Sequence, residues 1–154
     1  IEFCNGAIIE GFASFDVINH RRNHIELYGT KGSIIVPDPN MFGGPVFTSF
    51  SEGGEWEEHS TDEMQLGRIN IQNHSGKSNE ESQQSNYRGA GLSEMIYAIE
   101  NEIEHRCNGT LALHVLEIIE STIKSAEFAN VIELQTTCFK PKPFTEEVIF
   151  NIMK

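Results

Sequence analysis

Apolar and polar residues alternate through the first third of the chain, a pattern typical of β-strands. The Gly29-Thr30-Lys31-Gly32 sequence is predicted as a tight turn, because glycine adopts positive φ at little cost. Asn5-Gly6 is a second strong turn signal. The strands are predicted over residues 7–17, 25–28, 33–36, 45–50 and 56–58.

Two helices are predicted in the second half of the chain, because apolar residues recur there three and four positions apart. The first apolar stripe covers residues 92–103 and the second covers residues 113–126. Asn108-Gly109 separates the two stripes, and Thr110 is the predicted N-cap of the second helix.

Three further segments have their own patterns. Residues 131–137 alternate and are predicted as a strand that ends before Pro141. Residues 144–154 form a carboxy-terminal tail with helix-like spacing. The polar residues 60–86 are predicted as a long loop with one strand near residues 68–71.

Strands followed by a helical pair and another strand are typical of an α+β fold rather than of alternating βαβ units. We predict one domain over residues 1–143, with an open, mainly antiparallel sheet and the helix pair packed on one face. The other face stays apolar, and its candidate residues are Ile8, Phe12, Ile34 and Val36. We expect that face to be available for oligomerisation with a second copy.

The charge of the chain narrows its possible partners. Its 154 residues include 11 basic and 23 acidic side chains, a formal net charge of −12. Nucleic acids and anionic membranes attract clustered lysine and arginine, so neither is an expected partner. The three cysteines stand far apart, which suits a reducing, cytoplasmic location. His105 and Cys107 form the one close His/Cys pair, too few ligands for a structural zinc ion, so no metal site is predicted.

The chain begins Ile1-Glu2-Phe3-Cys4, without Met and already in strand-like sequence, so we expect it to be a piece of a longer protein. The Gly89-Ala90-Gly91 sequence resembles the start of a dinucleotide loop but lacks a βαβ context, and we interpret it as a flexible helix start. Asp16 and His20 are interpreted as part of a polar turn.

Three residues are candidates for ligand contacts. Tyr87 and Arg88 stand where the long loop meets the first helix, and arginine suits carboxylate or hydroxyl oxygens. His114 lies beside the apolar stripe of the second helix. The alternative interpretations are a tyrosine packed at the core rim, a solvated arginine and a hydrogen-bonded core histidine.

Four segments, in this order and spacing, resemble one known family: IELYGTKGSI at 25–34, PDPNMFGG at 37–44, NYRGAGL at 86–92 and LALHVLE at 111–117. The chain looks like the carboxy-terminal domain of a Gfo/Idh/MocA oxidoreductase. The resemblance covers the chain to about residue 143. It implies a substrate and oligomerisation domain whose partner, an amino-terminal Rossmann domain outside this chain, binds NAD or NADP.

The resemblance also implies the chemistry and the site. The family's substrates are sugars, inositols and related polyols, and hydride exchange is carried out by the nicotinamide. The family's glycine-rich loop and its Glu-Lys-Pro segment with the catalytic lysine are not in this sequence. We therefore predict no catalytic or cofactor-binding residue in the chain, which alone should be inactive. Tyr87, Arg88 and His114 are the predicted substrate contacts, with Asn40 and Phe42 as further loop candidates.

Two other functions stay open. The first is a non-catalytic sugar-binding or scaffold domain that dimerises through its sheet. The second, with less support, is a metal-dependent hydrolase that uses scattered histidine and glutamate side chains.

Overall fold

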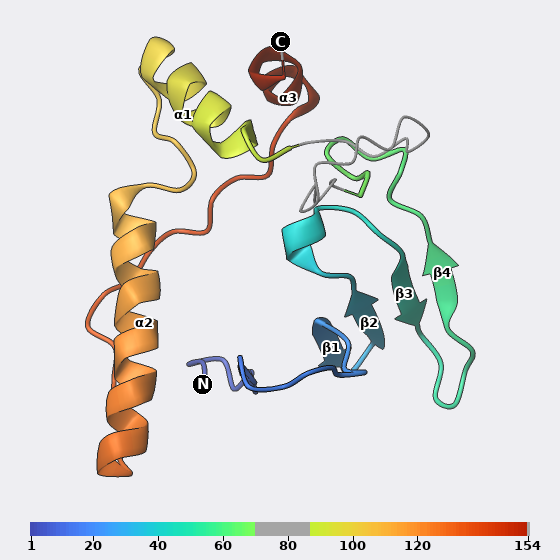
Figure 1. The fold of residues 1–154 in the computed structure, drawn as a ribbon, viewed down its shortest axis with the longest axis vertical. Helices are drawn as coiled ribbons and strands as arrows, with labels where there is room; N and C mark the ends of the chain where they lie inside the picture. The colour runs from blue at the N-terminus through green and yellow to red at the C-terminus, as the bar shows by residue number, and fades with distance from the viewer. Residues whose placement is uncertain (70–86, 154) are drawn as a thin grey trace.

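The computed structural model describes residues 1–69 and 87–153 (Figure 1). Within these ranges the chain forms four strands, three α-helices and a short 3-10 helix. The elements are β1 (Ile25–Gly29), β2 (Gly32–Val36), η1 (Pro39–Met41), β3 (Val46–Ser49), β4 (Glu57–His59), α1 (Ala90–Glu100), α2 (Gly109–Phe128) and α3 (Glu146–Ile152).

The described strands form an open antiparallel sheet in the order β1-β2-β3-β4. Gly29 pairs with Gly32 across the predicted turn, so β1 and β2 form a tight hairpin. The predicted strands at 25–28, 33–36, 45–50 and 56–58 therefore correspond to β1 to β4 with small shifts of their ends. The α+β class with an open antiparallel sheet is confirmed.

One face of this sheet carries most of its apolar residues. Strand register places Leu27 opposite Ile34 and Ile25 opposite Val36. We call this surface, made of Ile25, Leu27, Ile34, Val36 and Val46, the apolar sheet face. Its members remain accessible; Leu27 is 52% exposed.

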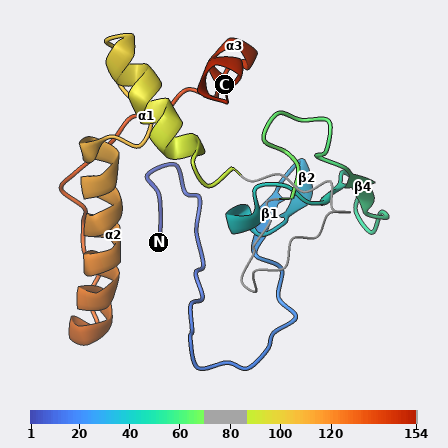
Figure 2. The same cartoon turned by 45° about the horizontal axis from the view of Figure 1, so that its top comes forward.

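The predicted packing of the helix pair on the sheet is not seen. Among the described elements, the main packing contact of a helix is the one between α1 and α3. The helices α1 and α2 lie to one side of the sheet rather than on its face (Figures 1 and 2). The physical reason is local: α3 and the segment before it occupy the buried side of α1. Ala90, Glu94 and Ala98 are buried there together with Ile152, and the predicted apolar stripe of α1 is left exposed.

Two strands predicted wholly within the described residues do not form, whereas the strand predicted near residues 68–71 of the long loop lies partly outside the described residues. Residues 7–17 form no ladder beyond the turn at Asn5-Gly6, where Gly6 has φ 82° and Glu2 bridges Ile8. The chain continues as a long loop to β1 (Figure 2), with Phe12 76% exposed. Residues 131–137 run back beside α2 without a strand partner (Figure 1). The predicted alternation of covered and exposed residues is present, since Ile132, Leu134 and Thr136 are more covered than the residues between them. The element beside this segment is the helix α2 and not a strand.

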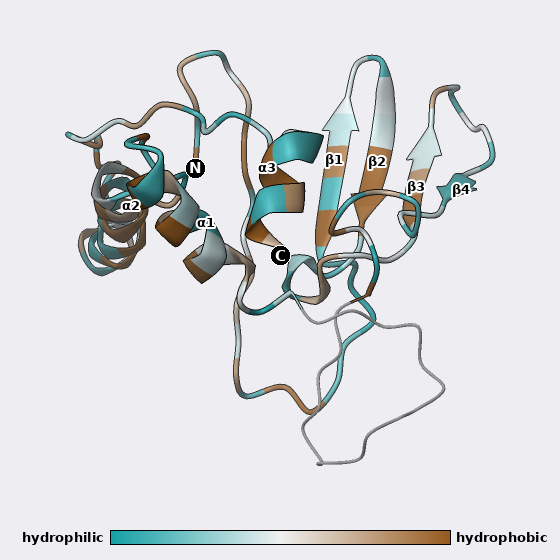
Figure 3. Cartoon of the chain, turned by 90° about the horizontal axis from the view of Figure 1, so that it is seen from above, coloured by the Kyte–Doolittle hydropathy of each residue, from teal (hydrophilic) through white to brown (hydrophobic). Residues whose placement is uncertain are grey.

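Much apolar surface is left uncovered. The accessible surface of the chain is 13253 Å². A compact chain of 17.3 kDa would expose about 7,800 Å². Figure 3 shows hydrophobic residues, in brown, on α1, α2 and β1 to β3. Large apolar side chains on these elements are thus in positions that a partner surface could bury.

Candidate functional site

Arg88 and Asn40 meet although they are far apart in the sequence. The Arg88 guanidinium Nη1 donates a hydrogen bond of 2.7 Å to Asn40 Oδ1. Arg88 stands just before α1, and Asn40 lies in η1 between β2 and β3. The contact therefore joins the sheet half of the chain to the helical half.

An aromatic pair lies beside this hydrogen bond. The ring centroids of Phe42 and Tyr87 are 5.3 Å apart, with an angle of 49° between the ring planes. Tilted pairs at this separation are favourable for aromatic rings. We call Asn40, Phe42, Tyr87 and Arg88 the Asn40–Arg88 cluster.

The loop that carries Asn40 and Phe42 is held by short-range bonds. Asp38 Oδ1 accepts from the Asn40 backbone N–H at 2.9 Å and so caps η1. Phe42 has φ 65°, and a positive φ is uncommon for an aromatic residue; the chain turns sharply here, with Gly43 N donating to Met41 O at 2.8 Å. The ring of Pro39, at the start of η1, holds φ near the value that a helical turn requires.

Glycines let the same loop pack closely against residues 61–67. A Cβ atom on Gly43 would lie 1.9 Å from Gly67 O, so a larger residue there would displace the backbone. The Thr61 hydroxyl oxygen accepts from Gly44 N at 3.0 Å and lies 2.6 Å from Gly67 O. These contacts fix the position from which Asn40 and Phe42 project.

His114 belongs to a different group of residues. Its Nδ1 lies 2.9 Å from Thr136 Oγ1, and that hydroxyl also contacts the Glu117 carboxylate. Glu117 accepts from the backbone N–H of Gln135 at 2.7 Å and of Thr136 at 2.8 Å. The Thr136 hydroxyl and then these two N–H groups lower the pKa of Glu117. The predicted contacts thus fall into two groups: Tyr87 and Arg88 together, and His114 on α2.

The structure also buries Glu94 of α1, which no sequence motif singles out. Its side chain is only 5% exposed, and Arg106 Nη1 lies 2.8 Å from its Oε1. Arg106 also donates from Nε to Lys142 O at 2.9 Å, and its guanidinium lies 4.0 Å above the Phe144 ring. Arg106 stands between the two predicted helices, and no sequence pattern indicates that it pairs with Glu94.

The described residues do not fit the pyrophosphate of a dinucleotide at Gly89-Ala90-Gly91. Gly89 is an N-cap with α-helical angles and no side-chain cap bond. The position of the third glycine of the fingerprint is Glu94, a buried carboxylate whose partner is Arg106. A negative charge at that position is unfavourable for phosphate.

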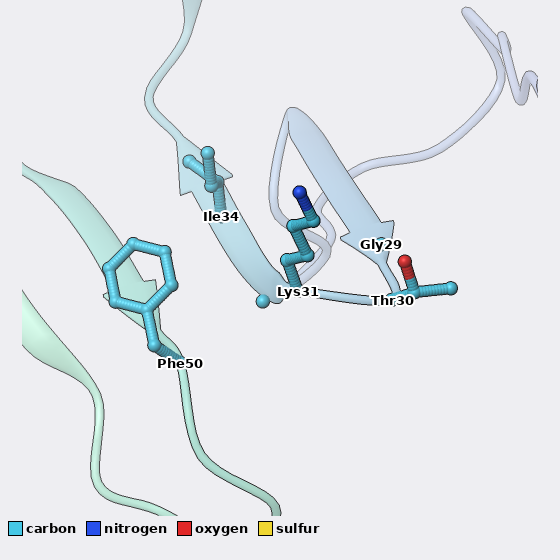
Figure 4. Close-up of a pocket in the computed structure, with 6 residues that line it drawn as sticks. Gly29, Thr30, Lys31, Ile34 and Phe50 are labelled. Atoms are coloured by element: carbon cyan, nitrogen blue, oxygen red, sulfur yellow. The ribbon is translucent and has the colours of Figure 1, made fainter.

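A hollow of about 360 Å³ lies at the β1–β2 turn (Figure 4). Lys31, Ile34 and Phe50 extend to the same side of the hairpin in this view. The hollow is open and mostly apolar, with Lys31 as its one charged lining residue. It is therefore a poorer candidate for a polar ligand than the Asn40–Arg88 cluster.

Residues 1–69 and 87–153 contain no group of three or more His, Cys, Asp or Glu side chains placed to hold a metal ion. None of the helices in these ranges has the length and apolar character needed to cross a membrane.

Comparisons of the whole chain with protein-family models, curated proteins and solved structures found no match.

Proposed function

We propose that the chain is the substrate-binding and oligomerisation domain of an NAD(P)-dependent oxidoreductase that acts on a sugar, an inositol or a related polyol. The sequence resemblance to Gfo/Idh/MocA oxidoreductases supplies the reaction class. The observation that carries the site is the Arg88–Asn40 hydrogen bond beside the Phe42–Tyr87 ring pair.

The chemistry of the cluster suits a polyol. Guanidinium N–H groups donate to hydroxyl oxygens, and an amide both donates and accepts. Aromatic faces pack against the C–H surface of a ring-shaped ligand. A few polar groups beside aromatic walls are the usual composition of a small-molecule site.

The nicotinamide would be held by a separate Rossmann domain, which in this proposal belongs to the longer protein. That cofactor carries the hydride, and this chain binds and orients the substrate. We expect the chain alone to bind a polyol weakly, to bind neither NAD nor NADP, and to show no turnover.

Calorimetric titration of the chain tests this assignment. A panel of sugars, inositols and polyols should include at least one that binds, and Arg88→Ala should weaken that binding. Arg21→Ala, which removes an exposed arginine far from the cluster in sequence, is the matched control and should leave binding unchanged. Tight binding of NAD or NADP to the unmodified chain would contradict the proposal.

The same proposal includes a second copy on the apolar sheet face. Ile25 and Leu27 on that face are exposed, so a second copy could bury their apolar side chains. Light scattering at micromolar concentration should show a dimer or larger species, and a monomer alone would contradict this part.

The scaffold alternative shares the exposed apolar surface but not the ligand. If the chain associates in solution while no polyol of the panel binds, a non-catalytic interaction domain becomes the better account. Polyol binding that depends on Arg88 contradicts the pure scaffold, but it is expected both for the oxidoreductase domain and for a non-catalytic sugar-binding domain.

A further inference from the structure

The histidine of α2 is connected to a glutamate through a threonine hydroxyl. Glu117 and His114 lie one turn apart on α2, and Thr136 comes from the segment that runs back beside this helix (Figure 1). Only one hydrogen is available on the threonine oxygen, so the direction of each bond in this series can be worked out.

Glu117 fixes the first direction. Its Oε1 accepts from Gln135 N at 2.7 Å, and its Oε2 accepts from Thr136 N at 2.8 Å. Backbone N–H groups can only donate, and their bonds to both oxygens favour the ionised carboxylate. An ionised carboxylate only accepts, so the Thr136 hydroxyl must donate its hydrogen to Oε2.

The second direction follows from the first. With its hydrogen directed at Glu117, Thr136 Oγ1 can only accept in the 2.9 Å contact with His114 Nδ1. Nδ1 must then carry a hydrogen. A neutral imidazole has one N–H, so Nε2 is left as an acceptor. Within residues 1–69 and 87–153 the structure records no partner for Nε2, and the side chain is half-buried.

We infer that Glu117 is a positioning residue that acts through Thr136 to hold neutral His114 as its Nδ1–H tautomer, so that Nε2 accepts a hydrogen bond from a ligand hydroxyl. The tautomer stands on the hydrogen bonds among His114, Thr136 and Glu117. The choice of a hydroxyl donor rests on the proposed polyol function.

Nuclear magnetic resonance of the histidine ring nitrogens tests the tautomer. Long-range proton–nitrogen correlation at about pH 8, where an ordinary histidine is neutral, distinguishes Nδ1–H from Nε2–H. Loss of signals in His114→Gln identifies the His114 ring. We expect Nδ1–H to predominate in the unmodified chain.

Substitutions at Thr136 separate positioning from a general structural effect. Thr136→Val removes the hydroxyl and should lower the ratio of Nδ1–H to Nε2–H by about tenfold, the equivalent of one hydrogen bond. Thr136→Ser restores the hydroxyl and should restore the ratio. Thr137→Val makes the same change at the exposed neighbouring position and should have no effect. Predominant Nε2–H in the unmodified chain, or an unchanged ratio in Thr136→Val, would overturn the inference.

A titration separates the tautomer from the ligand. Because His114 lies apart from the Asn40–Arg88 cluster, a hydroxyl at its Nε2 is a second contact, so a polyol added in excess should shift the Nε2 resonance of His114 in the unmodified chain, and less so in Thr136→Val. If the tautomer is Nδ1–H but that polyol leaves Nε2 unshifted, the hydroxyl contact is wrong. If no polyol binds at all, the proposed function is contradicted while the tautomer result is judged on its own.

Discussion

Arg106 is the residue whose removal should most disturb the helical half of the chain. Its guanidinium Nη1 lies 2.8 Å from Glu94 Oε1, and the two side chains are 24% and 5% exposed. It also holds Lys142 O at 2.9 Å and stacks on Phe144 at 4.0 Å. Arg106→Ala breaks all of these contacts and leaves a buried carboxylate without its cation.

The expected cost follows from that burial. Breaking a buried ion pair by removing one partner costs about 3–5 kcal/mol. The Arg106 backbone N–H, 3.2 Å from Glu94 Oε1, would still donate to the carboxylate. We therefore expect Arg106→Ala to lower the free energy of unfolding by about 3 kcal/mol, the lower end of that range, which is roughly a hundredfold in the unfolding equilibrium constant. Glu94→Gln should cost less, because the more exposed arginine can be hydrated.

Urea denaturation followed by far-ultraviolet circular dichroism measures this free energy of unfolding. The matched control is Lys124→Ala, which removes a cation 3.5 Å from Glu120 where both side chains are more than half exposed. That control should cost less than about 0.5 kcal/mol. If Arg106→Ala destabilises the chain no more than Lys124→Ala does, the Glu94–Arg106 pair does not hold α1 as argued.

Three further predictions concern α2 and the sheet. Asn108→Ala should destabilise the chain by about 1 kcal/mol in urea denaturation, because Asn108 Oδ1 accepts from Leu111 N, whereas Thr110→Ala should have little effect. The Thr136 hydroxyl and the neighbouring backbone N–H groups lower the pKa of Glu117. Ionised Glu117 therefore contributes its full stabilisation of the fold at pH values above the ordinary glutamate pKa, and this contribution is lost as the pH falls from there toward the lowered pKa. A series of urea midpoints should therefore fall less on acidification for Glu117→Gln than for the unmodified chain; parallel curves would contradict this. Leu27→Lys should reduce association in light scattering by placing a charge on the apolar sheet face, and an unchanged mass would place the interface elsewhere.

Short-range signals predicted the hairpin and the helices well. Gly29 and Gly32 lie at the two ends of a tight turn between two segments of alternating apolar residues, a combination typical of a β-hairpin. The strands β1 and β2 could therefore be predicted from local sequence. Helix spacing likewise identified α1 and α2, although the cap is Asn108 rather than Thr110, since its side chain reaches the Leu111 N–H. Both Asn and Thr are common N-cap residues, and which of them caps a helix depends on backbone angles that the residue types alone do not reveal.

Long-range partners could not be predicted from the sequence. Alternation at 131–137 shows which residues face a neighbour, but it does not say whether that neighbour is a strand or α2. Glu94 and Glu100 have the same chemistry on the same helix, but only Glu94 is on the buried side of α1, where it meets Arg106. Apolar stripes on α1 and α2 predicted burial that the described chain does not provide.

The candidate site was predicted in part. Tyr87 and Arg88 were expected from their place between a loop and a helix, and Asn40 and Phe42 only as further loop candidates. Their association depends on a contact between residues 48 positions apart, which no local pattern contains. His114 was expected for its chemistry, whereas its connection to Glu117 required the position of Thr136.

Chemical-shift mapping during a polyol titration shows whether a polyol binds at the Asn40–Arg88 cluster. Binding there should shift the Asn40 side-chain amide and the Arg88 Nε–H and leave Lys31 and Phe50 at the β1–β2 hollow unaffected. Saturating shifts at Lys31 and Phe50 with none at Asn40 and Arg88 would contradict it.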